Sequence, residues 1–125
     1  MHKPLLHRSF VAGGAIAPRR IVAVGAADGE VVQAADGSKF MPGVTEVIGA
    51  AAQGDRVDAA VLGPVDVEFG GNVAYGDPLT ADAQGRAVTA APAAGVNVWI
   101  VGFADVSGAV GDIGSMHLAP SIMQG

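Results

Sequence analysis

Residues 63–70 read Gly-Pro-Val-Asp-Val-Glu-Phe-Gly, so apolar and acidic side chains alternate between two glycines. Successive side chains of a β-strand point to opposite faces of a sheet, and this alternation therefore predicts a strand with one buried and one wet face. The Gly-Pro pair before it and the Gly-Gly pair after it are turn signals. The stretch indicates a sheet of short strands separated by tight turns.

The same arrangement continues along the chain, because short runs of Val, Ile and Ala alternate with many of its 19 glycines. Glycine accepts the positive φ angles that tight turns require. Residues 90–95, around Pro92, are expected to form a loop or one short helical turn. Further strands are expected at residues 19–24, 30–34, 44–50, 56–62, 79–80, 86–89, 96–103 and 113–118. The predicted fold is all-β, a small β-barrel or β-sandwich of short antiparallel strands with tight Gly/Asp turns.

Two Gly-Asp pairs, Gly54-Asp55 and Gly111-Asp112, each stand directly before an expected strand. Each follows an aliphatic pair ending in glycine, at residues 47–49 and 100–102. A glycine permits close backbone approach, and an Asp in a turn caps its own backbone. This recurring pattern is consistent with a structural repeat or with chance, since Gly and Asp are both common in this sequence.

A chain of 125 residues is the usual length of one domain. Residues 1–20 carry a net charge of +4 with no acidic residue, whereas the remainder carries −9. We therefore expect a basic, flexible N-terminal arm over residues 1–20, a single β-barrel domain over residues 21–120, and a C-terminal tail over residues 121–125.

Composition restricts the partners of this chain. An acidic body repels phosphate, so nucleic acid is not expected as a partner. No apolar run is long enough to span a bilayer, no secretory signal is apparent, and the absence of cysteine excludes disulfides. The core is rich in alanine and poor in aromatic residues, and small side chains stabilise weakly. We therefore expect a homo-oligomer in which an interface supplements the core.

Catalytic and metal-binding patterns are sparse. The histidines are His2, His7 and His117, and no Gly-x-Ser-x-Gly elbow surrounds a serine. His2 and His7 lack the helical i, i+4 spacing and a third ligand, and the acidic turns lack the density of a calcium loop. The sequence predicts no enzyme activity, no cofactor and no metal site.

Several of these features together resemble the phage capsid cement proteins, also called head decoration or stabilisation proteins. The resemblance runs from Val44 to Leu118 in order and spacing and does not extend over residues 1–40. Its motifs read here as Ile48-Gly49, Ala52-Gln53-Gly54-Asp55-Arg56-Val57, residues 65–70, Gly76-Asp77-Pro78-Leu79-Thr80, residues 82–89, Val101-Gly102-Phe103-Ala104 and Gly111-Asp112-Ile113.

The resemblance implies a structural virion protein made in the host cytoplasm. Such a protein decorates the outer surface of a phage head and stabilises the expanded capsid by bridging subunits of the major capsid protein, as a trimer. Under this hypothesis the arm contacts the capsid, and Trp99 and Phe103 lie between subunits, although a lone Trp is also typical of a core. The expected capsid-contact residues are Arg8, Arg19 and Arg20 as partners of carboxylates, and Phe10 as an apolar anchor.

Two other function classes remain open at this point. Small barrels with Gly-Asp turns also serve as ligand- or carbohydrate-binding modules, but these usually expose several aromatic rings, and this chain has one Trp, one Tyr and four Phe. An enzyme or enzyme accessory domain would require a pocket with convergent titratable groups.

Overall fold

The structure is a computed structural model that describes residues 6–125. Ten strands and no helix occur among these residues, so the all-β prediction is confirmed, and the described part of the chain has no helix that could cross a membrane. The strands are β1 (Leu6–Ala12), β2 (Ile21–Val24), β3 (Glu30–Gln33), β4 (Gly43–Thr45), β5 (Arg56–Leu62), β6 (Pro64–Glu68), β7 (Pro78–Ala81), β8 (Ala87–Thr89), β9 (Asn97–Ala104) and β10 (Ile113–Gln124).

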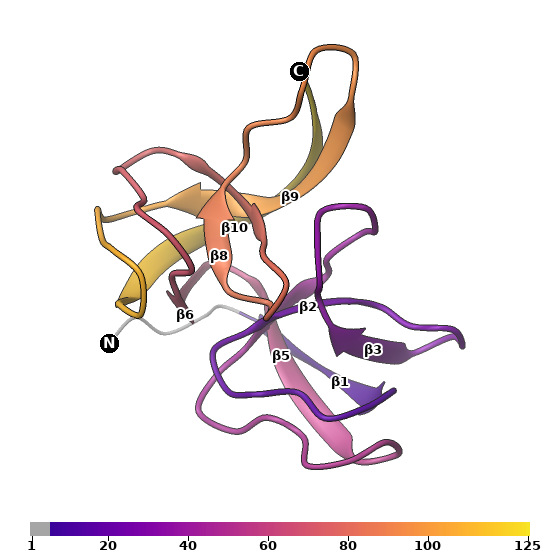
Figure 1. Ribbon diagram of the computed structural model, residues 1–125. Coiled ribbons are helices and arrows are strands. Elements are labelled where there is room, and N and C mark those ends of the chain that lie inside the picture. The colour runs from indigo at the N-terminus through magenta and orange to yellow at the C-terminus, as the bar shows by residue number, and fades with distance from the viewer. Residues whose placement is uncertain (1–5) are drawn as a thin grey trace.

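The first five strands form a closed barrel in the order β1-β3-β2-β4-β5 (Figure 1). Strands β1 and β5 close the ring as an antiparallel pair, in which Phe10 lies opposite Val57. The other edge of β1 runs parallel to β3, with Val11 opposite Glu30. Closure pairs both edges of every strand in the ring.

The remaining five strands form a second sheet in the order β6-β10-β9-β7-β8. The last strand in the sequence lies inside this sheet, because β10 pairs with β6 over residues 113–117 and with β9 over residues 116–124. Figure 1 shows this sheet beside the barrel, with one end of the β9–β10 pair projecting and carrying the C-terminal end of the chain.

One hydrophobic core joins the barrel to the second sheet. Ile21 and Met41 from the first half pack in the same cluster as Phe69 and Met116 from the second half, and all four are fully buried. Complete burial of side chains of this size stabilises by about 1.5–3 kcal/mol each. A second cluster lies within the barrel and consists of Phe10, Ala12, Ile16, Val22, Val31, Val57 and Ala59.

Glycine brings backbones close together at two positions in the sheets. A Cβ atom on Gly102 of β9 would collide with the carbonyl oxygen of His117, and one on Gly43 of β4 would collide with that of Ala60. These collisions are with backbone, which cannot rotate away as a side chain does. Glycine is therefore required at these two positions for the paired backbones to approach as closely as they do.

An Ala-x-Gly-Asp turn occurs three times, at residues 52–55, 74–77 and 109–112. In each, the Asp N–H donates to the Ala carbonyl oxygen, at 3.2, 3.0 and 3.0 Å, and the glycine φ is +91°, +88° and +86°. The Asp Oδ2 accepts the Ala N–H, at 3.1, 2.9 and 2.8 Å. The prediction that Asp caps its own turn is confirmed, and the copy at residues 74–77 adds a third example to the two recognised in sequence.

The expectation of a flexible basic arm is wrong for residues 6–20, while residues 1–5 lie outside the described part of the chain. Residues 6–12 form β1, which closes the barrel, and Ile16 forms an isolated bridge with Ala50. Phe10, Ala12 and Ile16 are buried in the barrel cluster. Burial of these apolar side chains outweighs the effect of the charged neighbours that suggested an arm.

The other two expected domain boundaries also differ from the structure. Residues 121–124 are not a tail but part of β10, where Gln124 lies opposite Asn97. Gly125 continues the pairing, since its N–H donates to Val96 and its carbonyl oxygen accepts from Gly95. Residues 21–120 do not form one barrel, because the barrel ends with β5 and the following strands form the second sheet.

Candidate functional site

Arg8 and Phe10 lie on β1 but have different surroundings. The Phe10 ring is 7% exposed and belongs to the barrel core, so it is not available as an anchor on another protein, and that prediction is wrong. The Arg8 guanidinium is exposed and lies 5.1 Å from the centre of the Phe10 ring, in a cation–π contact. Among the described residues Arg8 has no acidic partner within salt-bridge distance.

Arg19 and Arg20 lie where the barrel meets the second sheet. Arg20 Nη1 lies 3.0 Å from Glu68 Oε1, and Arg20 Nε donates to the carbonyl oxygen of Gln84 at 3.0 Å. Arg19 Nη1 lies 3.7 Å from Asp66 Oδ2. Both arginines therefore pair with carboxylates of the same chain, whereas the sequence analysis expected them to pair with carboxylates of the capsid.

The segment that carries these arginines is also held through its backbone. The Thr45 hydroxyl is fully buried, accepts the Arg20 N–H at 3.1 Å and donates to the carbonyl oxygen of Ala17 at 2.8 Å. Arg19 adopts φ +56°, an unusual angle for a residue with a side chain, and its carbonyl oxygen accepts the N–H of Glu68. The junction between the two sheets is thus a rigid, hydrogen-bonded contact.

Trp99 and Phe103 both lie on β9. Trp99 is partly buried against the main core, and its ring meets that of Phe40 edge to face, with the ring centres 5.5 Å apart. Trp99 lies directly opposite Ile122 of β10. Phe103 is 40% exposed, with β10 on one side and β7 on the other, where it lies opposite His117 and Pro78. The structure therefore leaves part of each ring accessible.

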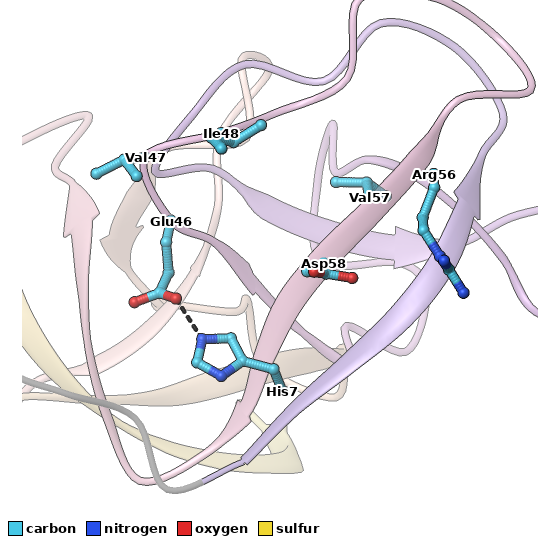
Figure 2. Close-up of a pocket in the computed structure, with 7 residues that line it drawn as sticks. All are labelled: His7, Glu46, Val47, Ile48, Arg56, Val57 and Asp58. Atoms are coloured by element: carbon cyan, nitrogen blue, oxygen red, sulfur yellow. Dashed lines mark hydrogen bonds and ion pairs between the residues drawn. The ribbon is translucent and has the colours of Figure 1, made fainter.

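A groove of about 470 Å³ opens on the outside of the barrel (Figure 2). Strands β1 and β5 form its floor, and the loop that follows β4 overhangs it. His7 on β1 pairs with the carboxylate of Glu46 in that loop. The lining residues are His7, Glu46, Val47, Ile48, Arg56, Val57 and Asp58.

Two exposed aliphatic residues form one wall of this groove. Val47 is 59% exposed and Ile48 is 77% exposed. Sequence analysis placed both within a strand over residues 44–50, but β4 ends at Thr45 and the chain then leaves the sheet. The glycine that follows marks this departure, since a Cβ on Gly49 would collide with the backbone of Ile16.

The groove has polar groups, but they do not form a catalytic arrangement. The Ser9 hydroxyl donates to Asp58 at 2.7 Å and His7 pairs with Glu46, so the serine and the imidazole have separate partners. The lining contains no Trp, Tyr or Phe, in contrast to the usual stacking surface of a carbohydrate site. Within residues 6–125 no cluster of three or more metal-ligating side chains occurs.

Ser107 and Ser115, which precede His117 in the sequence, also have other partners. The Ser107 hydroxyl accepts the N–H of Tyr75 at 3.0 Å. Ser115 is buried and its hydroxyl faces Asp105 at 3.5 Å, at the limit of a hydrogen bond. In the described part of the chain neither serine pairs with a histidine.

Comparison with solved structures places this architecture among known folds. The fold is similar to that of a phage head fiber base. One similar structure is the crystal structure of the head fiber gp8.5 N base in bacteriophage phi29, with a TM-score of 0.68 and 21% sequence identity. The match covers 91% of this chain and 93% of the other. No protein-family model matches this sequence, and no curated protein matches it.

Proposed function

We propose that this chain is a structural protein of a phage virion. The observation that carries the proposal is the match in fold with a head fiber base, which includes both sheets because it covers 91% of this chain. The resemblance of residues 44–118 to head decoration proteins supports the same assignment from independent motifs. Both resemblances support an association with a phage head.

In more detail, we propose that the chain decorates the outer surface of the head and stabilises the expanded capsid by bridging major capsid subunits, as a homotrimer. This role requires a stiff body rather than a reactive site. The junction formed by Arg19 and Arg20 with Asp66 and Glu68 supplies such stiffness. Repetition around a symmetry axis converts several weak contacts into strong binding.

The contact with the capsid is proposed to lie at the groove and its rim. Val47 and Ile48 are exposed apolar side chains beside charged ones, which is the composition of an interface core with a polar border. Of the four residues first expected to contact the capsid, Arg8 keeps a guanidinium without an acidic partner among the described residues. Arg8 lines a separate hollow beside Phe10 and Phe40, and it is proposed to form a second contact, with a capsid carboxylate.

Co-sedimentation with expanded phage heads that lack the protein tests this function. Deletion of residues 1–20 is unsuitable as a variant, because it would remove β1 and open the barrel. Substitution is the better approach: Ile48→Glu places a charge at the proposed contact and is expected to weaken binding at least about 10-fold. The matched control is Val110→Glu, an aliphatic residue that is 61% exposed in the turn before β10.

Saturable binding of the wild-type protein and of Val110→Glu, together with weak binding of Ile48→Glu, would support the function and the contact. Equal binding of both variants would show that the groove does not contact the capsid. Failure of the wild-type protein to bind any expanded head would overturn the proposed function.

A further inference from the structure

The far end of the second sheet is a two-stranded ribbon, in which residues 97–100 of β9 pair with residues 121–124 of β10. Strand β6 pairs with β10 only as far as His117, and one further backbone bond joins Leu118 to Gly63. From residue 119 onward, the edge of β10 that faces away from β9 has no neighbour among the described strands. Figure 1 shows this ribbon projecting from the rest of the molecule.

The ribbon belongs to the part of the chain that lacks charge. The chain contains 19 charged residues, yet residues 87–104 and 113–125 include no Asp, Glu, Lys or Arg. Natural proteins usually protect exposed strand edges with charged side chains, proline or bulges. Here Pro120 and the irregular pairing between Leu118 and Ser121 interrupt one point of the edge, and residues 121–124 beyond it are unprotected.

Apolar side chains form a continuous stripe across the ribbon. Trp99 contacts Phe40 on one side and lies opposite Ile122 on the other, and residues directly opposite in an antiparallel pair share a face. Phe40 is 40% exposed and Ile122 is 54% exposed. The stripe therefore runs from the loop before β4 over β9 to the open edge of β10.

A two-stranded ribbon is only marginally stable in water. The rest of the chain holds this one at Trp99, whose N–H donates to the carbonyl oxygen of Gly37 at 2.8 Å and whose carbonyl oxygen accepts the Thr80 hydroxyl at 2.9 Å, and the β10 side of the ribbon has no such support from the described strands. This one also exposes aromatic and aliphatic surface without charged residues, which is the composition of an interface core rather than of a solvated surface. Both observations indicate that another surface covers the ribbon in the functional state.

We propose that the Phe40–Trp99–Ile122 stripe and the open edge of β10 bind a second copy of this chain in solution. The chain has a net charge of −5, so two copies repel one another over most of their surface, and a charge-free face is the surface on which they can meet without burying a charge. In a trimer the charge-free faces of neighbouring copies meet around the three-fold axis. The inference rests on the proposed function, for which it names the surface between subunits.

Light scattering coupled to size-exclusion chromatography, at protein concentrations from about 1 to 100 µM, tests the self-association. The wild-type protein is expected to be oligomeric at the upper end of this range. Ile122→Glu would bury an unpaired charge and is expected to raise the dissociation constant on the order of 100-fold. Val110→Glu, which places the same charge on an exposed turn, should leave the oligomer unchanged.

Fluorescence of Trp99 provides a second measurement, because it is the only tryptophan of the chain. Emission of the wild-type protein should shift to longer wavelength on dilution as the ring becomes hydrated, and emission of Ile122→Glu should already be shifted at high concentration. Phe40→Asp is a second variant, on a loop residue, in case Ile122→Glu fails to fold. A wild-type protein that is monomeric throughout the range, or variants that associate like the wild type, would overturn the proposal.

Binding to phage heads separates this proposal from the proposed function. Ile48→Glu should remain oligomeric in solution while binding heads weakly, whereas Ile122→Glu should be monomeric. A monomeric wild-type protein that still binds expanded heads would overturn the inference and leave the function in place. A wild-type protein that is oligomeric in solution but binds no head would support the inference and overturn the proposed function.

Discussion

Arg20 Nη1 lies 3.0 Å from Glu68 Oε1, across the junction between the barrel and the second sheet. The two side chains are 18% and 23% exposed, so solvent screens their interaction less than that of a surface pair. Glu68 is also approached by Arg86, whose Nη1 lies 3.9 Å from Oε2, and Arg86 Nε in turn lies 2.9 Å from Asp82. The pair is therefore part of a small network that fixes the two sheets to each other.

Substitution Arg20→Ala is expected to reduce the free energy of unfolding by about 1–3 kcal/mol, because it removes the ion pair and the bond to the carbonyl oxygen of Gln84. Urea denaturation measures this change. Arg56→Ala is the control, since Arg56 is exposed and has no ion pair among the described residues, and its effect should lie within about 0.5 kcal/mol. Equal effects of the two substitutions would contradict the structural role of the junction.

Phe10→Ala tests whether β1 is an integral part of the barrel. Loss of a buried phenyl ring is expected to cost about 3–5 kcal/mol, whereas Val11→Ala on the same strand removes a side chain that is 49% exposed and should cost less than about 1 kcal/mol. Thermal unfolding followed by circular dichroism compares the two. A small effect of Phe10→Ala would instead fit a detached arm.

Gly76→Ala tests the repeated turn. Gly76 has φ +88°, and no atom lies within 4 Å of the Cβ position, so the expected loss of about 1 kcal/mol comes from the backbone angle and not from a collision. Gly14→Ala is the matched control, because its Cβ position is equally open and its φ lies outside the left-handed region. That substitution should be neutral or stabilise by up to about 1 kcal/mol. Chemical denaturation of both proteins decides the comparison.

Asp36 should titrate below its usual pKa of 3.8, because the Ser38 hydroxyl donates to its carboxylate at 2.6 Å and the Ser38 N–H at 2.9 Å. A carboxyl whose pKa is lowered by folding stabilises the folded protein above its unfolded pKa, and this contribution is lost as the pH falls through the folded value. Ser38→Ala should move the pKa of Asp36 back toward 3.8. NMR titration of the carboxyl carbon measures it, and an unchanged pKa would show that the serine is not the cause.

Local patterns predicted strands well where a turn signal stands at each end. The expected strand over residues 56–62 coincides with β5, which follows the Gly54-Asp55 turn and ends before Gly63. Strand β1 was missed because His7, Arg8 and Ser9 dominate its composition, although Phe10 and Ala12 already alternate as they do in the barrel core. The alternation is short and is obscured by polar residues at the barrel surface.

The candidate sites were harder to predict, because they depend on distant parts of the chain. Arg20 was expected to bind a carboxylate of the capsid, and only the closed fold brings Glu68 of the same chain beside it. Ile48 was assigned to a strand, since an aliphatic pair is typical of a strand until Gly49 and the end of β4 redirect the chain. The exposed stripe depends on the contact between Phe40 and Trp99, which are far apart in sequence.

The arrangement of the first and last strands also has a consequence for how the chain folds. Strand β1 must wait for residues 56–62 before the barrel can close, and β6 and β9 must wait for β10, which follows both of them in the sequence. Pairing between such distant segments is slow, because loop closure costs entropy before contacts compensate for it. Until residues 113–124 have been synthesised, one edge of β6 and one edge of β9 lack their partner strand, so the second sheet is protected from aggregation only after β10 has paired.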